Sequence, residues 1–276
     1  MIRTGEYNEL EVLRDTSSGL FLGDGEGNDV LLPGKYIPEG TKVGDKLKVF
    51  IYLDSEDRLV ATTETPKIRL HGFALLRTVM VNEIAAFMDW GLEKHLFVPF
   101  REQNKKMEEG RSYVVFMYID DQTNRLTGSA RLNRFLDNEK LTVRTGDEVE
   151  ILIWEKTDLG YNVIINGKHK GLIYDNEIFS EVKPGYRLKA WIKNIREDHK
   201  IDVIIQKPGY EAIDPTSKRI LDLLKSNGGF LALSDNSSPE EITAKLQMSK
   251  KTFKKAVGAL YRRKTIELKE DGIHLV

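Results

Sequence analysis

The 276-residue sequence contains no cysteine and no long run of apolar residues. A chain without cysteine has no disulfide, no thiolate nucleophile and no cysteine zinc site. No segment approaches the ~20 consecutive apolar residues that a membrane-spanning helix needs. Residues 1–6 also lack the hydrophobic core of a secretion signal. These absences predict a cytoplasmic protein that does not enter a membrane.

Signals of catalysis are equally scarce. The five histidines are scattered, and no pair has the helical spacing of zinc ligands. A nuclease would need a carboxylate cluster to hold Mg²⁺, whereas Asp120-Asp121 falls in an expected turn. Gly23, Gly25 and Gly27 lie between two expected strands, which favours a hairpin tip over a nucleotide-binding loop. We therefore expect no catalytic residues, no metal ion and no small-molecule cofactor.

The net charge of −1 conceals an uneven distribution. Residues 216–276 contain 12 Lys and Arg against 7 Asp and Glu, so the remainder is acidic on balance. A nucleic-acid-binding protein need not be basic overall if its positive charge is concentrated on one module. The basic tail is therefore either such a module or an ordinary solvated surface.

The clearest structural pattern lies between residues 148 and 206. Apolar residues alternate with others from Tyr161 to Ile165, the period of a strand, and Asn166-Gly167 then forms a tight turn. A short helical turn is expected at 175–179. The five expected strands cover residues 148–154, 161–165, 171–174, 188–195 and 201–206. Five short strands with this spacing predict a small closed barrel.

Part of this pattern occurs three times. Residues 43–52 are echoed at 109–118 and again at 184–193, and their glycines lie 66 and 75 residues apart. A strand, a polar turn, a basic residue and another strand follow each glycine. The repeat predicts three tandem barrels.

The repeat also places one aromatic residue at the same position in each barrel. Phe50, Phe116 and Trp191 stand six residues after the repeat glycine. Their parity is opposite to that of the residues that suit the barrel interior, so these rings are expected to point outward. We favour their packing against a loop or the adjacent domain over stacking with bases.

The C-terminal segment has a different pattern. A helix is expected from Thr216, and Ser238 with Glu241 forms a capping box for a second helix. Ser249 caps a third, which extends to about residue 264. Strands at 266–269 and 273–276 then form a hairpin. Three helices and a hairpin predict a winged helix-turn-helix.

Two segments of the third barrel resemble the S1 RNA-binding barrel, a branch of the OB fold. They are residues 159–163 and 171–177. The resemblance implies single-stranded RNA bound by aromatic stacking beside a basic groove. The S1 pattern has aromatic residues at the positions of Leu159 and Asn162, and a histidine at Tyr174. It has an acid and a base at Arg196 and Lys200, so only Tyr174 and Lys200 keep its chemistry.

The earlier repeats keep other parts of the S1 pattern. Phe21 holds the second aromatic position in the first repeat, and Asp54 with Arg58 keeps the acid–base spacing. Trp90 is assigned to the first aromatic position in the second repeat. Either the RNA contacts are therefore shared among the three barrels, or the first two barrels are largely scaffold.

The ordered architecture, together with residues 171–179, 248–256 and 258–261, resembles the conserved virulence factor B family, also called the YitL family. The resemblance implies a bacterial RNA-binding protein without catalytic activity, linked to expression of virulence-related genes. We expect a mainly β chain with an α+β C-terminal module. Its expected domains are three S1-like barrels at 1–66, 67–140 and 141–210, and a winged helix at 211–276.

Candidate RNA-binding residues come from the barrels and from the third helix, which has no acidic residue between 249 and 264. The alternative for the helix is a solvated basic face. The candidates are Phe21, Arg58, Tyr161, Lys168, Lys170, Tyr174, Arg196, Lys200, Lys250, Lys251, Lys254, Lys255, Arg262 and Arg263.

Three functions are consistent with the sequence. The first is non-catalytic, post-transcriptional regulation through single-stranded RNA. The second is transcriptional regulation, with the winged helix on duplex DNA. The third is a protein–protein adaptor, in which the winged helix and the outward aromatic residues contact a partner.

Overall fold

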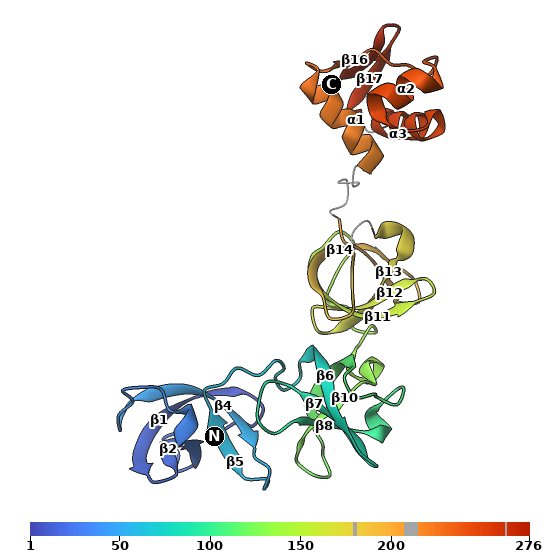
Figure 1. The fold of residues 1–276 in the computed structure, drawn as a ribbon. Helices are drawn as coiled ribbons and strands as arrows, with labels where there is room; N and C mark the ends of the chain where they lie inside the picture. Colours follow the sequence, from blue (N-terminus) through green and yellow to red (C-terminus); the bar gives the residue numbers. More distant parts are fainter. Residues whose placement is uncertain (179–180, 207–214, 263) are drawn as a thin grey trace. The chain divides into compact units, whose positions relative to one another are not determined.

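A computed structural model of the chain describes residues 1–178, 181–206, 215–262 and 264–276. It divides into two compact units, Met1–Ile205 and Gln206–Val276. The first unit is built from strands and short 3-10 turns, and the second contains the α-helices (Figure 1). Phe179, Arg263 and the predicted domain limit between residues 210 and 211 lie outside the described residues. The other predicted domain limits stay predictions.

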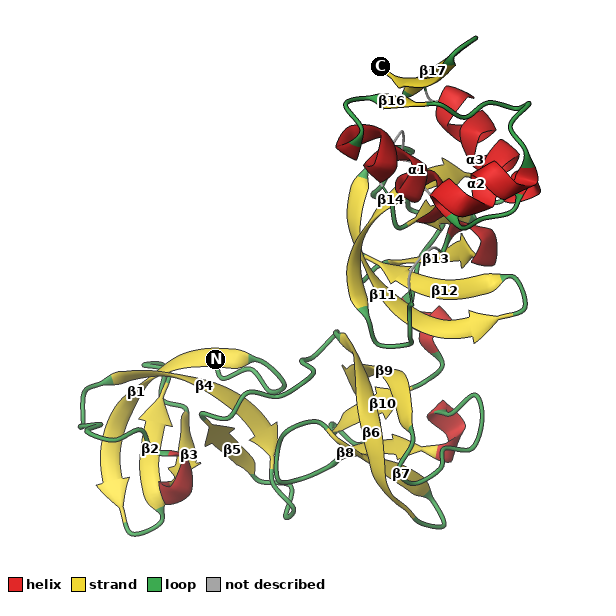
Figure 2. Cartoon of the chain, turned by 45° about the horizontal axis from the view of Figure 1, so that its top comes forward, coloured by secondary structure: helices red, strands yellow, loops and turns green. Residues whose placement is uncertain are grey.

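The first unit contains three closed five-stranded barrels, as predicted (Figure 2). Each barrel has the same neighbour order, in which the third strand pairs with the fifth and the first with the fourth. Barrel 1 contains β1 (Tyr7–Thr16), β2 (Gly19–Gly23), β3 (Asp29–Pro33), β4 (Lys46–Leu53) and β5 (Leu59–Thr62). Barrel 2 contains β6 (Phe73–Val81), β7 (Ala85–Asp89), β8 (Leu96–Pro99), β9 (Ser112–Ile119) and β10 (Leu126–Ser129). Barrel 3 contains β11 (Glu148–Thr157), β12 (Gly160–Ile165), β13 (His169–Tyr174), β14 (Arg187–Ile195) and β15 (Ile201–Ile204).

The local sequence explains how barrel 3 closes. Val163 and Ile165 of β12 belong to its core, so the alternating side chains point outward. Asn166 and Gly167 have φ angles of 49° and 66°, the left-handed values that a two-residue hairpin turn requires. A register shift in the first strand, between Ile153 and Glu155, recurs at the matching place in the other two barrels. Such bulges bend a strand and help a small sheet to close.

Short 3-10 turns follow the third strand of each barrel. They are η1 (Gly34–Tyr36), η2 (Phe100–Glu102) and η4 (Asp175–Glu177), and the last confirms the helical turn expected there. A fourth turn, η3 (Leu132–Phe135), connects barrels 2 and 3 and buries Leu132 completely.

The joint between barrels 1 and 2 is apolar. Phe50 on β4 is fully buried and shares a core with residues of barrel 2. Its ring meets the edge of Trp90 at 5.9 Å between centroids, and Tyr7 at 5.4 Å. The predicted outward packing against an adjacent domain is therefore confirmed for Phe50.

Phe116 occupies the equivalent position at the joint between barrels 2 and 3. It stacks on Phe135 of η3 with 4.1 Å between ring centroids. The same cluster includes Leu152, Trp154 and Ile164 of barrel 3. The prediction is thus confirmed for Phe116, whereas Trp191 is half-buried and its packing stays a prediction.

The second unit has the predicted winged-helix elements. They are α1 (Pro215–Ser226), β16 (Phe230–Leu231), α2 (Pro239–Leu246), α3 (Lys250–Arg262), β17 (Ile266–Lys269) and β18 (Gly272–Leu275). Ser238 and Glu241 form the capping box at α2. Phe253, Val257 and Leu260 bury one side of α3.

Replacing Phe50 by Ala should loosen the joint between barrels 1 and 2. Truncating a fully buried phenylalanine costs about 3–5 kcal/mol, because buried area is lost and a cavity remains. The urea dependence of hydrogen exchange in β4 and β7 would measure the loss. Phe21→Ala, a half-buried position outside the joint, is the control. An equal effect of both substitutions would contradict a specific role for Phe50.

Candidate nucleic-acid interface

One outer face of barrel 3 forms a pocket of about 540 Å³. Because side chains alternate along a strand, Lys170, Leu172 and Tyr174 of β13 point to the same side. Asn162 of β12, which is paired with Leu172, also lines the pocket. Leu159, 62% exposed, stands at the edge in the hairpin between β11 and β12. Arg196 and Lys200 also line the pocket, which therefore contains all five positions of the S1 pattern.

Arg196 is fixed by two neighbours within this pocket. Its guanidinium donates to both carboxylate oxygens of Asp202, at 2.9 and 3.1 Å, and to the hydroxyl of Tyr174. The Asp202 carboxylate, followed by the Tyr174 hydroxyl, raises the pKa of Arg196 above its ordinary value. The arrangement holds the tyrosine ring in place, while Asp202 offsets the charge of Arg196.

The positive charges of Lys170 and Lys200 are less offset by neighbouring carboxylates than the charge of Arg196. Lys200 is exposed and pairs with Asp198 at 2.6 Å, an arrangement that water screens strongly. Lys170 donates to the side-chain oxygen of Asn133 and lies 5.2 Å from the ring centroid of Trp154. Neither contact of Lys170 involves a carboxylate.

The structure brings four of the predicted barrel residues together, namely Lys170, Tyr174, Arg196 and Lys200. Tyr161 lies on the other side of β12, where its ring packs against the core and Lys156 lies 4.6 Å from its centroid. Lys168 is exposed at the turn after β12 and does not line the pocket.

The strand register identifies the equivalent positions in the other barrels. Asn162 pairs with Leu172, Phe87 pairs with Phe97, and Phe21 pairs with Leu31. Phe21 thus occupies the second aromatic position, as predicted. The matching residue of barrel 2 is Phe87, which is not among the candidates predicted from the sequence. Phe87 is the third residue of β7, just as Asn162 is the third residue of β12.

The face of barrel 2 carries a pair of aromatic rings. Phe87 and Phe97 are half-buried, with ring centroids 5.8 Å apart, and line a pocket of about 380 Å³ with Arg125. Ile84, 63% exposed, takes the hairpin position that Leu159 has in barrel 3. The assignment of Trp90 to the first aromatic position is therefore wrong.

Trp90 serves the joint between barrels instead. It is only 2% exposed, and its indole N–H donates to the carbonyl of Lys94. Its ring contacts Phe50 and Tyr52 of barrel 1 edge-on. A ring buried in this way cannot stack on a base.

In barrel 1 the corresponding face carries charge next to an aromatic ring. The guanidinium carbon of Arg14 lies 4.0 Å from the ring centroid of Phe21, an arrangement typical of a cation–π contact. Arg58 is exposed and pairs with Asp54 at 2.7 Å. Burial would raise the pKa of Asp54, yet hydrogen bonds from Arg58 keep it below its ordinary value.

In the second unit, the basic residues of α3 point away from its core. Lys251, Lys254, Lys255 and Arg262 are exposed, and Lys250 is half-buried. Lys254 lies 3.6 Å from Asp235. Across the described residues, the other four have no carboxylate within ion-pair distance. The RNA-binding assignment of all these residues stays a prediction.

Within the described ranges, no group of three His, Asp or Glu side chains is placed to hold a metal ion. No helix in the described part of the chain is both long and apolar enough to cross a membrane.

Comparisons with known proteins agree with this architecture. A family model of the S1 domain matches residues 4–64, and one of the CvfB-like winged helix domain matches residues 218–275. The chain is 24% identical over 280 residues to conserved virulence factor B of Staphylococcus epidermidis, covering 98% of this chain and 94% of that protein. It is related to the conserved virulence factor B proteins. The resemblance predicted from the sequence is confirmed.

Two further relatives extend the comparison. YitL of Bacillus subtilis is 24% identical over 273 residues, covering 95% of this chain and 90% of that protein. A solved structure of a multidomain protein with nucleic acid binding domains from Streptococcus pneumoniae is 23% identical, with a TM-score of 0.44. It covers 99% of this chain and 98% of that chain. The S1 match falls on barrel 1, whereas the residues whose sequence most resembles the S1 pattern lie in barrel 3.

Replacing Asn162 by Trp should restore an aromatic residue at the second S1 position of barrel 3. Stacking of one base on an aromatic ring is worth about 1–3 kcal/mol, so single-stranded RNA should bind more tightly and quench the new tryptophan. Titration followed by fluorescence would measure both effects. Tyr186→Trp, 44% exposed and outside the pocket, is the control. Equal quenching in both variants would count against this face.

Proposed function

We propose that the chain is a non-catalytic RNA-binding protein that regulates bacterial gene expression after transcription. Single-stranded RNA would lie along the outer faces of the barrels, and the basic helix α3 would add phosphate contacts. Binding would depend mainly on charge and stacking, with modest sequence preference. We place this activity in the cytoplasm, as the sequence predicts.

The equivalence of the three outer faces is the main support for this proposal. At the position shared by Asn162, Phe87 and Phe21, two barrels carry an aromatic ring. A basic residue lies beside each position: Lys170 in barrel 3, Arg125 in barrel 2 and Arg14 in barrel 1. Rings next to cations suit a single strand, because every base has a face that can stack and every linkage has a negative charge.

The names of the relatives support the biological setting. Conserved virulence factor B is the name of the staphylococcal relatives. We extend to this chain a role in the expression of virulence-related genes.

A second candidate is duplex DNA, and the exposed basic face of α3 favours it. In DNA-binding winged helices the corresponding helix enters the major groove. The aromatic faces of barrels 1 and 2 favour single-stranded RNA instead, because the bases of a duplex are already stacked on one another. An adaptor that binds only a protein partner is the third candidate.

A titration of the full chain at two salt concentrations should separate these candidates. We expect labelled single-stranded RNA to bind more tightly than duplex DNA of equal length, and to weaken steeply as salt rises. Preference for the duplex would identify a transcriptional regulator. No binding to either nucleic acid at ~50 mM salt, where phosphate contacts are strongest, would favour the adaptor.

The double change Lys251→Glu and Lys255→Glu should weaken RNA binding about fivefold or more at low salt. It should also flatten the salt dependence, because each lost single-strand phosphate contact removes roughly 0.7 from the slope of log K against log salt. Fluorescence anisotropy would measure both quantities. Lys218→Glu with Lys225→Glu, exposed positions on α1, makes the same change in net charge. Equal losses in the two double variants would remove α3 from the binding site.

A further inference from the structure

One cavity of the first unit lies away from the S1-type faces. It measures about 720 Å³ and is lined by three separate parts of the chain. These are the residues before and within β1, the connector from Pro66 to Phe73, and the strands and turn of barrel 3 around Asn166. Pockets of about 300–1,000 Å³ accommodate groups of nucleotide size.

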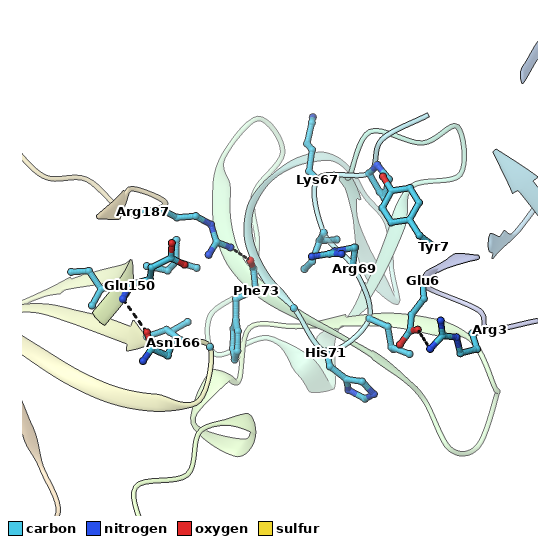
Figure 3. A pocket seen from close by; sticks show the side chains of 18 residues that line it. Arg3, Glu6, Tyr7, Lys67, Arg69, His71, Phe73, Glu150, Asn166 and Arg187 are labelled. Atoms are coloured by element: carbon cyan, nitrogen blue, oxygen red, sulfur yellow. Dashed lines mark hydrogen bonds and ion pairs between the residues drawn. The ribbon is translucent and has the colours of Figure 1, made fainter. Parts of the chain in front are cut away.

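Hydrogen bonds hold the walls of the cavity to one another. The backbone N–H of Leu70 donates to the carbonyl of Gly5 at 2.9 Å, which fixes the connector against barrel 1. The N–H of His71 donates to the carbonyl of Met117 in barrel 2 at 2.8 Å. The guanidinium of Arg187 on β14 donates to the carbonyl of Phe73 on β6 at 2.5 Å (Figure 3). The cavity is therefore a built feature of the unit.

The charge of the lining is predominantly positive. Four cationic side chains, Arg3, Lys67, Arg69 and Arg187, face two carboxylates, Glu6 and Glu150. His71 lines the same space. A site with more positive than negative side chains attracts anions. The anions of the proposed RNA ligand are its phosphodiester groups.

The four cations differ in how far they are neutralised. Arg3 pairs with Glu6 at 3.2 Å, and Lys67 pairs with Asp89. Arg187 donates to a carbonyl group, which is neutral, so its charge is retained. Arg69 is exposed and, across the described ranges, has no carboxylate partner; Figure 3 shows it on the connector between Lys67 and His71.

We propose that this cavity binds phosphate groups of a single-stranded RNA as the strand passes between barrel 1 and barrel 3. The proposal rests on the proposed function, and it adds a contact that the S1 pattern does not contain. Arg69 and Arg187 would contact the phosphodiester oxygens, because a planar guanidinium matches their geometry. Tyr7, half-buried at the cavity wall, offers an aromatic face beside them.

Arg69 is the residue best suited to a test. Its side chain is exposed and makes no ion pair in the described part of the chain, so its replacement should leave the fold intact. Arg187 is less suitable, because its bond to Phe73 connects barrels 2 and 3. Arg77 on β6 is an exposed arginine that lines neither this cavity nor the pockets on barrels 2 and 3, and it gives a matched control.

The experiment compares Arg69→Glu with Arg77→Glu in the full chain. The probe is a labelled mixed-sequence RNA of about 24 nucleotides, longer than the roughly 4–16 nucleotides that one OB fold covers. We expect Arg69→Glu to weaken binding about three- to tenfold and to lower the salt slope by roughly 0.7 or more. Arg77→Glu should leave the slope unchanged. Arg69→Gln, which removes the charge without reversing it, should show a smaller loss in the same direction.

Each outcome decides one question. If the wild-type protein binds RNA and the two Glu variants behave alike, the cavity does not bind phosphate, while the proposed function stands. If the wild-type protein does not bind RNA, both proposals fail. If Arg69→Glu also lowers the melting temperature, the affinity of Arg69→Gln decides, and an unchanged affinity and slope would overturn the proposal.

Discussion

The first unit depends on aromatic residues that point out of the barrels. Each five-stranded barrel is small, and a small core contributes little stability by itself. Phe50 is fully buried in a core that it shares with Trp90 of the next barrel, and Phe116 packs in the same way among residues of barrel 3. These joints combine three weak cores into one compact unit. These contacts position the outer faces of the barrels relative to one another. A nucleic-acid strand that crosses several faces therefore depends on the joints.

The internal repeat made the joints predictable from the sequence. Strand parity separates residues that fill a barrel from those that point out of it, and Phe50 and Phe116 share the same outward-pointing position, six residues after the repeat glycine. The turn at Asn166-Gly167 and the capping box at Ser238 were predictable for a different reason, because both are local. The architecture follows from these local and periodic signals.

The candidate site was less predictable, because it depends on register and on tertiary ion pairs. Tyr161 and Tyr174 lie on neighbouring strands, yet only Tyr174 faces the pocket. Phe87 does not stand out in the sequence beside Trp90, and its pairing with Phe97 in the sheet identifies its place. The bond between Arg196 and Tyr174 joins residues 22 positions apart, which no sequence pattern encodes.

The three outer faces share a position but differ in chemistry. Barrel 2 presents two rings, barrel 1 a ring under an arginine, and barrel 3 a tyrosine held by an arginine whose charge Asp202 offsets. A single exposed ion contact is weak and is screened within about 10 Å at moderate salt. A protein with a net charge of −1 therefore needs several such contacts in series to hold a polyanion. Firmly joined barrels meet that need, because each further contact on the same strand forms at little additional entropic cost.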